Sequence, residues 1–460
     1  MDADDFVTQL QRALPSGYVL TDPDIITAYS HDDAEWAPAG RADALVRART
    51  AEQVQIVVRL CIKYGRPIVA RGSGTGLSGG ANAIDGCVVL SLDKMTEVVL
   101  IDATERIAVV QPGVINDDLR AACAEHGLWY PPDPASSPWS SIGGNVATNA
   151  GGVCCVKYGV TRDYVLELQV VTGTGELVRI GHRTAKGVAG YDLVGLMVGS
   201  EGTLGIVTEV TVRLLPLPDP GITVVGYFSS LHDAGAAVAE VTRAGLVPAA
   251  FELVDKHCLA AVDAWKNMDL SVDAEVLLLA RSDERGSSGE QTADGIIACF
   301  DKVGATFTAR SSTVEEAEML FSARRLAYPA LERLGPVLTE DVCVPKGAIP
   351  SMLAIIEKAA QRHGTKIANI AHVGDGNLHP LLITPHDDPD SRSRAQAAFE
   401  DIITGALELG GTVTGEHGVG LLKRDGLARE LSAPVIAMHH SVKRALDPHN
   451  IMNPGKAIPD

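Results

Sequence analysis

Hydrophobic and polar residues follow patterns in the first half of the chain that predict a mixture of helices and strands. Apolar residues recur at helical spacing around Phe6–Leu14 and over Ala51–Cys61, which predicts two helices. Short runs of β-type residues predict strands, and the last two of these runs flank a Gly-Thr-Gly turn and predict a hairpin. The predicted strands cover residues 67–71, 88–92, 107–111, 164–172 and 176–180.

A run of prolines with a glycine over residues 215–221 interrupts these patterns and predicts a domain boundary. Beyond it, predicted strands at 223–227 and 275–280 alternate with predicted helices at 231–244 and 289–300. This alternation predicts an α+β layer in which a sheet carries helices on one face. A chain of 460 residues is too long for one ordinary core, so we expect two or three domains.

Composition narrows the class of protein. With 46% hydrophobic and 21% charged residues the chain is typical of soluble globular proteins. Its net charge of −19 argues against nucleic acid or an anionic membrane as the main partner. The sequence has no apolar run long enough for a transmembrane helix and no signal-peptide pattern, so we expect a cytoplasmic protein, with peripheral contact at the inner face of the membrane left open. The eight cysteines form no CxxC pair, and we expect most of them to be buried.

Three glycine-rich segments indicate a nucleotide-type cofactor. The first, Arg71–Gly80, follows a predicted strand, and its small residues would let backbone N–H groups approach a phosphate. We reject a Rossmann dinucleotide loop, because such a loop opens into a helix and here the strand at 88–92 follows. The other two segments are the nearly uncharged run 140–152 and residues 199–207. Three such segments exceed what turns alone require.

Two short motifs near the C-terminus carry candidate metal ligands. His372 and His379 flank a Gly-Asp-Gly-Asn turn, and Glu416 precedes His417 in a Gly-Glu-His-Gly segment. Two imidazoles and a carboxylate are a natural ligand set for a divalent metal. If Glu416 and His417 are extended, their side chains face opposite ways, so that one binds metal while the other faces substrate. Surface or capping roles are the commoner use of histidine, and we assign them to His182, His257, His363 and His449.

Together these motifs resemble those of a known family. Residues from about 40 to 217 resemble the FAD-binding domain of the vanillyl-alcohol oxidase and p-cresol methylhydroxylase superfamily. The C-terminal motifs resemble its D-2-hydroxyacid dehydrogenase branch, which includes the glycolate oxidase D subunit, FAD-linked D-lactate dehydrogenases and D-2-hydroxyglutarate dehydrogenase. The resemblance implies an α+β fold, with a two-subdomain FAD-binding domain of the p-cresol methylhydroxylase type and a substrate-binding cap made of an antiparallel sheet plus helices. The implied domains are residues 1–217 for FAD (core 38–217), 218–414 for the cap, and 415–460 for a C-terminal segment that returns to the flavin site.

The resemblance also implies which residues contact FAD. A glycine loop should hold the pyrophosphate, two further groups should line the groove on either side, and a C-terminal asparagine should return to the flavin. Since residues 71–80 contain no histidine, we expect noncovalent FAD rather than the covalent tether of some superfamily members. The implied contacts are Arg71, Gly72, Ser73, Gly74, Thr75, Gly76 and Leu77 in the loop, Pro132, Ser141, Gly144, Asn145, Thr148 and Gly151 on one side, Glu201, Gly202 and Ile206 on the other, and Asn453.

For the chemistry, the resemblance implies that His372, His379 and Glu416 bind a divalent metal, often assigned as zinc, and that His417 is the proton-abstracting base. The metal would lower the pKa of the substrate's α-hydroxyl, and a hydride equivalent would pass to flavin N5. The expected reaction is the oxidation of a small D-2-hydroxy acid to the 2-oxo acid.

Binding of the substrate carboxylate needs a cation. Arg324 matches the family's substrate-binding arginine, whose planar fork suits a carboxylate, and Lys346 is a weaker second candidate. Members that take a longer dicarboxylate carry an asparagine two residues past the second histidine, where this chain has Leu381. The difference favours a monocarboxylate of the D-lactate or glycolate type.

Several alternatives stay open. They are a D-2-hydroxyglutarate dehydrogenase, a metal-free FAD alcohol oxidase of the same fold that uses O2, and a flavin-bearing subunit that mainly serves assembly; an NAD-dependent Rossmann enzyme is disfavoured by the loop. The chain has no iron–sulfur or haem motif, so electrons should pass to an external acceptor other than NAD: a quinone, a cytochrome, an electron-transfer flavoprotein or an iron–sulfur subunit. We expect no nucleic-acid partner, and a homodimer is compatible with the sequence.

Overall fold

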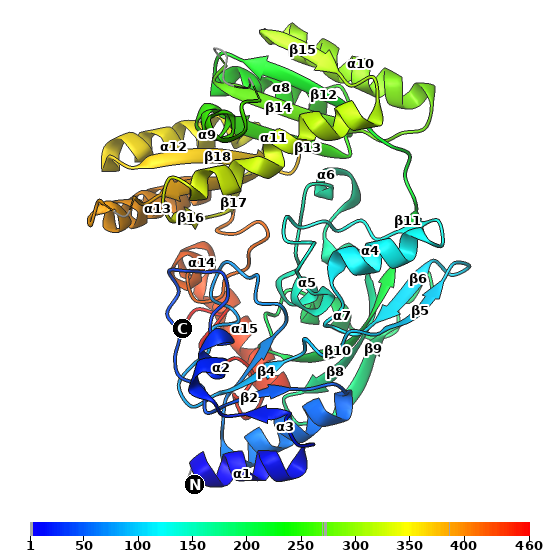
Figure 1. Cartoon of the computed structure of the whole chain (residues 1–460), viewed down its shortest axis with the longest axis vertical. Helices are drawn as coiled ribbons and strands as arrows, with labels where there is room; N and C mark the ends of the chain where they lie inside the picture. Colours follow the sequence, from blue (N-terminus) through cyan, green and yellow to red (C-terminus); the bar gives the residue numbers. More distant parts are fainter. Residues whose placement is uncertain (1–2, 269, 271–273, 386) are drawn as a thin grey trace. The chain divides into compact units, whose positions relative to one another are not determined.

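The computed structural model describes residues 3–268, 270, 274–385 and 387–460, and it divides the chain into two compact units (Figure 1). The first unit comprises the described residues up to Gly151, Val160–Leu217 and Glu416–Asp460. The second comprises Gly152–Gly159 and Pro218–Gly415. The chain therefore leaves the first unit twice and returns to it at its C-terminal end.

A four-stranded sheet opens the first unit, with the strand order β1-β2-β4-β3. Strands β2, β4 and β3 run parallel, and β1 is antiparallel to β2. Every residue of β4 is buried, as expected of a parallel strand covered on both faces. The elements are α1 (Ala3–Ala13), β1 (Val19–Leu20), α2 (Pro23–Ala28), β2 (Ala44–Arg47), α3 (Ala51–Tyr64), β3 (Ile68–Arg71) and β4 (Val88–Ser91).

The remaining strands of the first unit form an antiparallel sheet with the order β5-β6-β10-β8-β9 and a small sheet of β7 and β11. Strands β8 and β9 pair as the predicted hairpin. The elements are β5 (Val98–Asp102), β6 (Ile107–Val110), α4 (Asn116–Ala124), β7 (Leu128–Trp129), α5 (Ile142–Thr148), η1 (Thr161–Asp163), β8 (Val165–Thr172), β9 (Leu177–Gly181), α7 (Leu193–Met197), β10 (Gly205–Arg213) and β11 (Leu215–Pro216).

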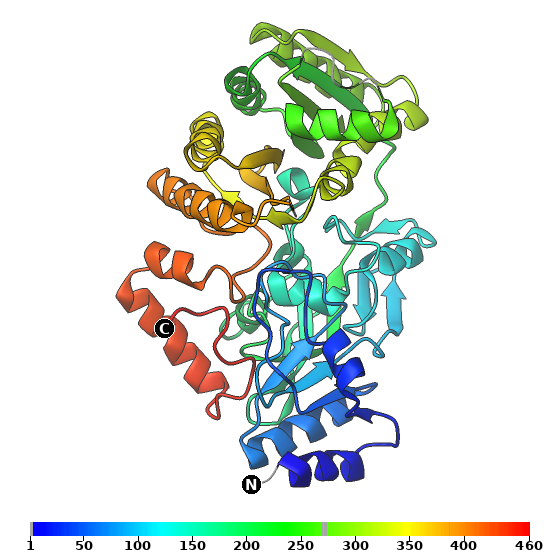
Figure 2. The same cartoon turned by 60° about the vertical axis from the view of Figure 1, so that its left-hand side comes forward.

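The C-terminal segment completes the first unit. It contains α14 (Arg424–Glu430) and α15 (Ala433–Leu446), drawn in orange and red in Figure 2. After α15, Ile451 and Met452 enter the same hydrophobic core as β3 and β4, and Met452 forms a parallel bridge with Ile68. Burial of this apolar pair anchors the end of the chain against β3.

The second unit is built on one eight-stranded sheet with the order β15-β12-β14-β13-β18-β19-β16, in which β17 also pairs with β19. Neighbouring strands run antiparallel. The elements are α6 (Cys155–Tyr158), β12 (Ile222–Phe228), α8 (Leu231–Arg243), β13 (Ala250–Asp255), α9 (Lys256–Lys266), β14 (Val276–Ser282), α10 (Ser287–Lys302), β15 (Phe307–Arg310), α11 (Val314–Glu332), β16 (Val337–Thr339), β17 (Val342–Cys343), η2 (Lys346–Ala348), α12 (Ile349–His363), β18 (Lys366–His372), β19 (Asn377–Ile383) and α13 (Ser391–Glu408).

Helices cover both faces of this sheet, so the prediction of helices on one face is wrong. Val225 of β12 joins a core cluster that includes residues of α9 and α11. The next residue, Gly226, faces the other way, where an added Cβ would lie 2.4 Å from the Phe300 ring of α10. Strands buried on both faces are nearly continuously apolar, and β13 is buried along its whole length.

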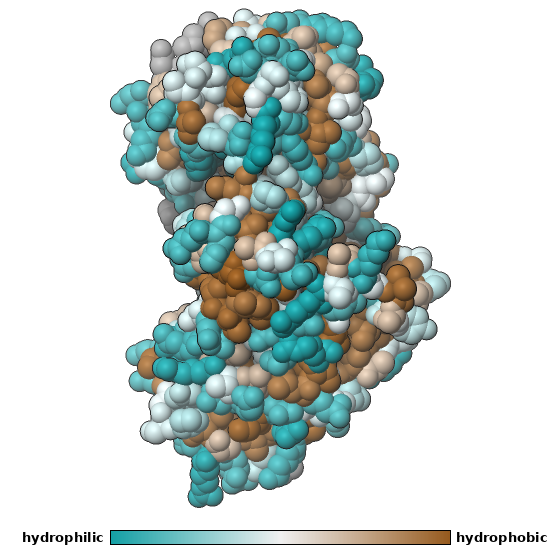
Figure 3. Space-filling view, turned by 90° about the vertical axis from the view of Figure 1, so that its right-hand side faces the viewer, coloured by the Kyte–Doolittle hydropathy of each residue, from teal (hydrophilic) through white to brown (hydrophobic). Residues whose placement is uncertain are grey.

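Surface composition and cysteine burial agree with the expectations from the sequence. On the face drawn in Figure 3, hydrophilic side chains spread over the surface and hydrophobic ones gather in patches between them. Most of the cysteines are buried, and burial raises the pKa of Cys87 and Cys123 to about 11, which makes both thiols poor nucleophiles. In the described part of the chain no helix has the length and apolar character needed to cross a membrane.

Candidate active site

The first glycine-rich loop follows directly from β3, as the sequence predicts. Gly72 packs so closely against Ser141 that an added Cβ would lie 2.3 Å from its hydroxyl oxygen, and Gly74 has a φ of +84°. Among the described residues, none accepts a hydrogen bond from the backbone N–H groups of residues 72–77. The loop therefore presents a series of unused donors beside a partly exposed surface, which is the property of an anion-binding nest.

Arg71 lies at the base of this loop and is largely buried. Its guanidinium donates a hydrogen bond to the carbonyl of His31, at 2.5 Å, and lies 5.8 Å from the Tyr29 ring centroid. A Cβ at Gly74 would come within 2.0 Å of the same guanidinium. Burial lowers the pKa of Arg71, while nearby acids such as Asp32 raise it.

The second segment supplies the expected groove residues on α5 and in the chain before and after it. Ser141 caps α5 by accepting the N–H of Gly144, and Thr148 donates its hydroxyl to the carbonyl of Gly144. The side chain of Asn145 is 3% exposed, and within the described structure its amide nitrogen has no hydrogen-bond partner. A buried donor of this kind is costly unless it is satisfied, so it marks a place for an acceptor from a ligand. Pro132 uses its carbonyl to accept from the Asn116 side chain, and Gly151 is buried at the end of the first segment of this unit.

The third segment is bonded to the returning C-terminal chain. Glu201 has a φ of 51° and is followed by Gly202 at +70°. Its buried carboxylate accepts the N–H groups of Val419 and Gly420, both at 2.8 Å. Asn453 donates its amide to the carbonyls of Gly80 and Glu201, at 2.9 and 2.8 Å. These polar side chains thus fix the backbone around the glycine segments.

Both Glu201 and Ile206 in this third segment are buried. Desolvation raises the pKa of Glu201, although the two backbone donors lower it. The Ile206 side chain packs in the hydrophobic core with β3 and β4, and Ile206 pairs with Val171 of β8 within the sheet, so its side chain is not available to a ligand.

In the second unit, the hairpin of β18 and β19 holds the two candidate histidine ligands. The ring centroids of His372 and His379 are 5.0 Å apart and nearly perpendicular, and both side chains are buried. Gly376 permits the turn between them, because its φ is +86° and an added Cβ would lie 2.1 Å from the carbonyl oxygen of Val344. The hairpin therefore fixes both rings on one face of the sheet.

Glu416 completes the predicted set of ligands. It follows Gly415, whose N–H is accepted by the buried carboxylate of Asp341 at 2.5 Å. One potential ligand atom from each of His372, His379 and Glu416 lies within 4.8 Å of the other two. The next residue, His417, has its Nε2 3.9 Å from a carboxylate oxygen of Glu416.

The arginine predicted to bind substrate is linked to this set by a carboxylate. Glu252 of β13 is fully buried, with one oxygen 2.7 Å from Nδ1 of His372 and the other 2.8 Å from Nε of Arg324. Burial acts to raise the pKa of Glu252, but the electrostatic interactions and hydrogen bonds with His372 and Arg324 outweigh it and lower the pKa. Lys346, the second candidate, is exposed at the start of η2.

Comparisons with known proteins identify the family. Residues 217–457 match the model of the C-terminal domain of FAD-linked oxidases, and residues 42–181 match an FAD-binding domain. The chain is 41% identical over 415 residues to the glycolate oxidase subunit GlcD of Bacillus subtilis, covering 90% of this chain and 88% of the relative. The chain belongs to the FAD-linked oxidases.

Other relatives agree with this assignment. The chain is 35% identical to GlcD of Escherichia coli K12, over 100% of this chain and 92% of the relative. It is also 35% identical to a D-lactate dehydrogenase of Anaerostipes hadrus, over 95% and 94%. Among solved structures, p-cresol methylhydroxylase superposes with a TM-score of 0.82 at 19% identity, over 99% of this chain and 97% of that one. The predicted fold class and family are confirmed, and the protein is an FAD-linked oxidoreductase.

The first unit of this FAD-linked oxidase fits the cofactor of its family. The N–H groups of residues 72–77 offer donors for a pyrophosphate, and the buried amide of Asn145 offers one more. Contact between Gly72 and Ser141 brings the first two glycine-rich segments together. These features agree with a cofactor that lies along both segments.

Sequence reasoning missed Glu252 and Asp341 in this FAD-linked oxidase. A single acid within the apolar run Phe251-Glu252-Leu253-Val254 was the one signal in the sequence, because a buried carboxylate needs a partner.

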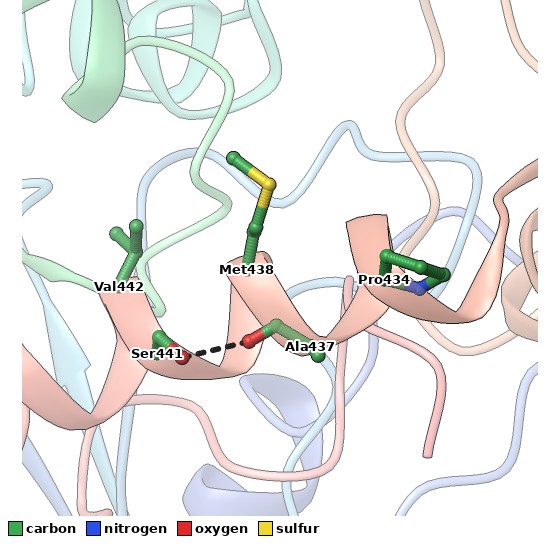
Figure 4. Close-up of a pocket in the computed structure, with 5 residues that line it drawn as sticks. All are labelled: Pro434, Ala437, Met438, Ser441 and Val442. Carbon is green, nitrogen blue, oxygen red and sulfur yellow. Dashed lines mark hydrogen bonds between the residues drawn. The ribbon is translucent and has the colours of Figure 1, made fainter.

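A shallow pocket on α15 is lined by Pro434, Ala437, Met438, Ser441 and Val442 (Figure 4). These residues have no titratable side chains, so the pocket does not suit the oxidation of a hydroxy acid.

Proposed function

We propose that this FAD-linked oxidase converts a small D-2-hydroxy acid, of the D-lactate or glycolate type, to the corresponding 2-oxo acid. The observation that carries the proposal is the buried group of His372, His379, Glu252 and Arg324, completed by Glu416. Ligands for a metal and a cation for a carboxylate are what a 2-hydroxy acid requires, because its hydroxyl and carboxylate oxygens can chelate one ion. Relatives named glycolate oxidase subunit and D-lactate dehydrogenase support the same substrate class.

The ligand set suits a divalent cation, and zinc is the metal that we favour. Two imidazoles and one carboxylate leave open positions for substrate oxygens, as in catalytic rather than structural zinc sites. Such an ion would act as a Lewis acid toward the hydroxyl oxygen. His372 would offer Nε2 as its ligand atom, because its Nδ1 is bonded to Glu252.

Arg324 would bind the substrate carboxylate. Its Nε–H is taken by Glu252, so the two terminal nitrogens remain for a bidentate pair with a carboxylate. His417 would take the hydroxyl proton, since an imidazole can act as a base near neutral pH. FAD would supply the two-electron oxidant that accepts the α-hydrogen as a hydride equivalent.

Leu381 bears on the choice of acid. It is fully buried on β19 within the hydrophobic core that includes α11, so its side chain gives no hydrogen-bond donor for a second carboxylate. A monocarboxylate therefore fits better than a 2-hydroxy dicarboxylate. Electrons would leave toward an external acceptor: a quinone, a cytochrome, an electron-transfer flavoprotein or an iron–sulfur subunit.

Anaerobic reduction of the purified holoenzyme tests the proposal. D-lactate, glycolate, L-lactate and D-2-hydroxyglutarate are mixed separately with the oxidised protein, and loss of the visible absorbance of oxidised flavin is followed. We expect rapid bleaching by D-lactate or glycolate, slow or no bleaching by L-lactate, and a weaker response to D-2-hydroxyglutarate. A flavin that stays oxidised with all four acids would refute the proposed reaction.

A further inference from the structure

Glu252 occupies an unusual place for a carboxylate. It lies in the middle of β13, a strand buried along its whole length, directly opposite His372 in the register of β13 and β18. Its side chain lies on the same face as those of Ala250 and Val254, which pack in the core cluster with α9 and α11. Burial of an ionised carboxylate is costly unless each oxygen is paired, so its partners identify its role.

Each oxygen of Glu252 has a different partner. One lies 2.7 Å from Nδ1 of His372 and the other 2.8 Å from Nε of Arg324, which comes from α11. An ionised carboxylate only accepts hydrogen bonds, so Nδ1 of His372 must carry the proton. In that tautomer Nε2, rather than Nδ1, is the nitrogen whose lone pair can bind a metal ion. The second bond fixes the plane of the guanidinium and leaves its terminal N–H groups for another anion.

We propose that Glu252 is a positioning residue that holds the metal ligand His372 and the substrate-binding Arg324 in one hydrogen-bonded unit. This inference rests on the proposed function for the roles of its two partners. The carboxylate sets the tautomer of one and the orientation of the other, so that a single substitution at Glu252 disturbs both metal affinity and carboxylate binding. Neither effect requires Glu252 to touch the substrate.

A glutamine at this position has the same shape but cannot satisfy both partners. Its amide has one acceptor oxygen, so the NH2 group must face either the Nε–H of Arg324 or Nδ1 of His372. In the second arrangement the amide donates to Nδ1, which forces the proton of the imidazole onto Nε2 and blocks metal binding there. An aspartate is shorter, but it keeps the charge and both acceptor oxygens.

Zinc affinity of the holoenzyme provides a readout that is independent of turnover. The FAD-loaded protein is stripped of metal by a chelator, and zinc is titrated in competition with a chromophoric chelator for wild type, Glu252→Gln and Glu252→Asp. We expect Glu252→Gln to bind zinc roughly 10- to 100-fold more weakly than wild type. The zinc affinity of Glu252→Asp should lie between those of wild type and Glu252→Gln. The reason is that the site needs two acceptor oxygens more than it needs the full side-chain volume.

Asp255→Asn is the matched control. Asp255 is also a buried carboxylate of β13, but it accepts hydrogen bonds from Cys258 and Asn369, and among the described residues no histidine or arginine donates to it. This variant should keep wild-type zinc affinity. At saturating zinc, Glu252→Gln should also raise the KM for D-lactate more than it lowers kcat, whereas Asp255→Asn should leave the KM unchanged.

The order of the variants decides the outcome. A merely structural role would place Glu252→Gln, which keeps the shape, closer to wild type than Glu252→Asp, and that order would overturn the inference. Equal losses in Glu252→Gln and Asp255→Asn would overturn it as well. If Glu252→Gln does not fold, Glu252→Met, which has a similar volume and no acceptor oxygen, carries the test, and zinc affinity within twofold of wild type refutes the proposal. Zinc binding is measured without turnover. If the enzyme does not react with D-2-hydroxy acids, the proposed function is refuted, but the proposal that Glu252 positions the metal ligand is not.

Discussion

Lys456 near the C-terminus offers a quantitative test of how the end of the chain is held. Its side chain is 2% exposed, and its ammonium group donates to the carbonyls of Gly80 and Asn82. Burial lowers the pKa of Lys456 from its ordinary value of 10.5 to about 8, although the neighbouring Cys87, Asp32 and Glu201 act to raise it. The folded chain therefore holds this proton less tightly than the unfolded chain does.

The sign and size of the effect follow from linkage. Between pH 8 and 10.5 the unfolded chain binds more protons than the folded chain, so the free energy of unfolding rises with pH in this window. The penalty for burying the charge is fully present below about pH 8 and is gone above 10.5. At about 1.4 kcal/mol for each pKa unit, the difference corresponds to about 3 kcal/mol.

The assay compares wild type with Lys456→Met by urea unfolding from pH 7 to pH 10.5. A methionine keeps most of the side-chain volume but cannot titrate, and the loss of its two hydrogen bonds is the same at every pH. The free energy of unfolding of wild type, relative to that of the variant, should therefore rise by about 3 kcal/mol across this range. Lys94→Met, at an exposed lysine, should follow the wild-type curve. Parallel curves for wild type and Lys456→Met would refute the assignment of a buried, charged amine.

Three further predictions concern the reaction. His417→Gln should retain FAD and its absorbance spectrum but slow flavin reduction by D-lactate by roughly 100-fold or more; reduction at the wild-type rate would remove His417 as the base. Treatment with EDTA should abolish turnover, and added zinc should restore it, whereas full activity in the chelator would exclude an essential metal. Arg324→Lys keeps the charge but loses the planar fork, so the KM for D-lactate should rise about tenfold or more, while Arg325→Lys, at the exposed neighbour, should leave the KM unchanged.

Local patterns in the sequence were enough to predict those helices and strands that are determined by residues close together in the chain. The predicted hairpin at 164–180 matches β8 and β9, and the helix predicted from Ala51 matches the start of α3, which Thr50 caps by accepting the N–H of Gln53. His372 and His379 meet because their turn is short, and short turns leave signatures of glycine and asparagine.

What the sequence could not reveal depends on partners that lie far apart along the chain. Glu252 and His372 are 120 residues apart, and Glu252 and Arg324 are 72 apart, so no local spacing indicates that one carboxylate serves both. The helices on both faces of the second sheet were missed for a related reason. Which face of a continuously apolar strand a helix covers is decided by packing, and periodicity carries no information when both faces are buried.

The contacts of the first unit also bear on how FAD would be recognised. Of the polar side chains that the family resemblance assigns to the cofactor, Glu201 and Asn453 are already bonded to backbone groups of the returning C-terminal chain and of the glycine segments. Arg71, at the start of the glycine loop, donates a hydrogen bond to the backbone carbonyl of His31. The donors left for a pyrophosphate are then chiefly the N–H groups of residues 72–77, which no described residue uses. Recognition through the backbone requires small residues and a fixed loop rather than particular side chains, which is why the glycines, and not the charged residues around them, carry the signal in the sequence.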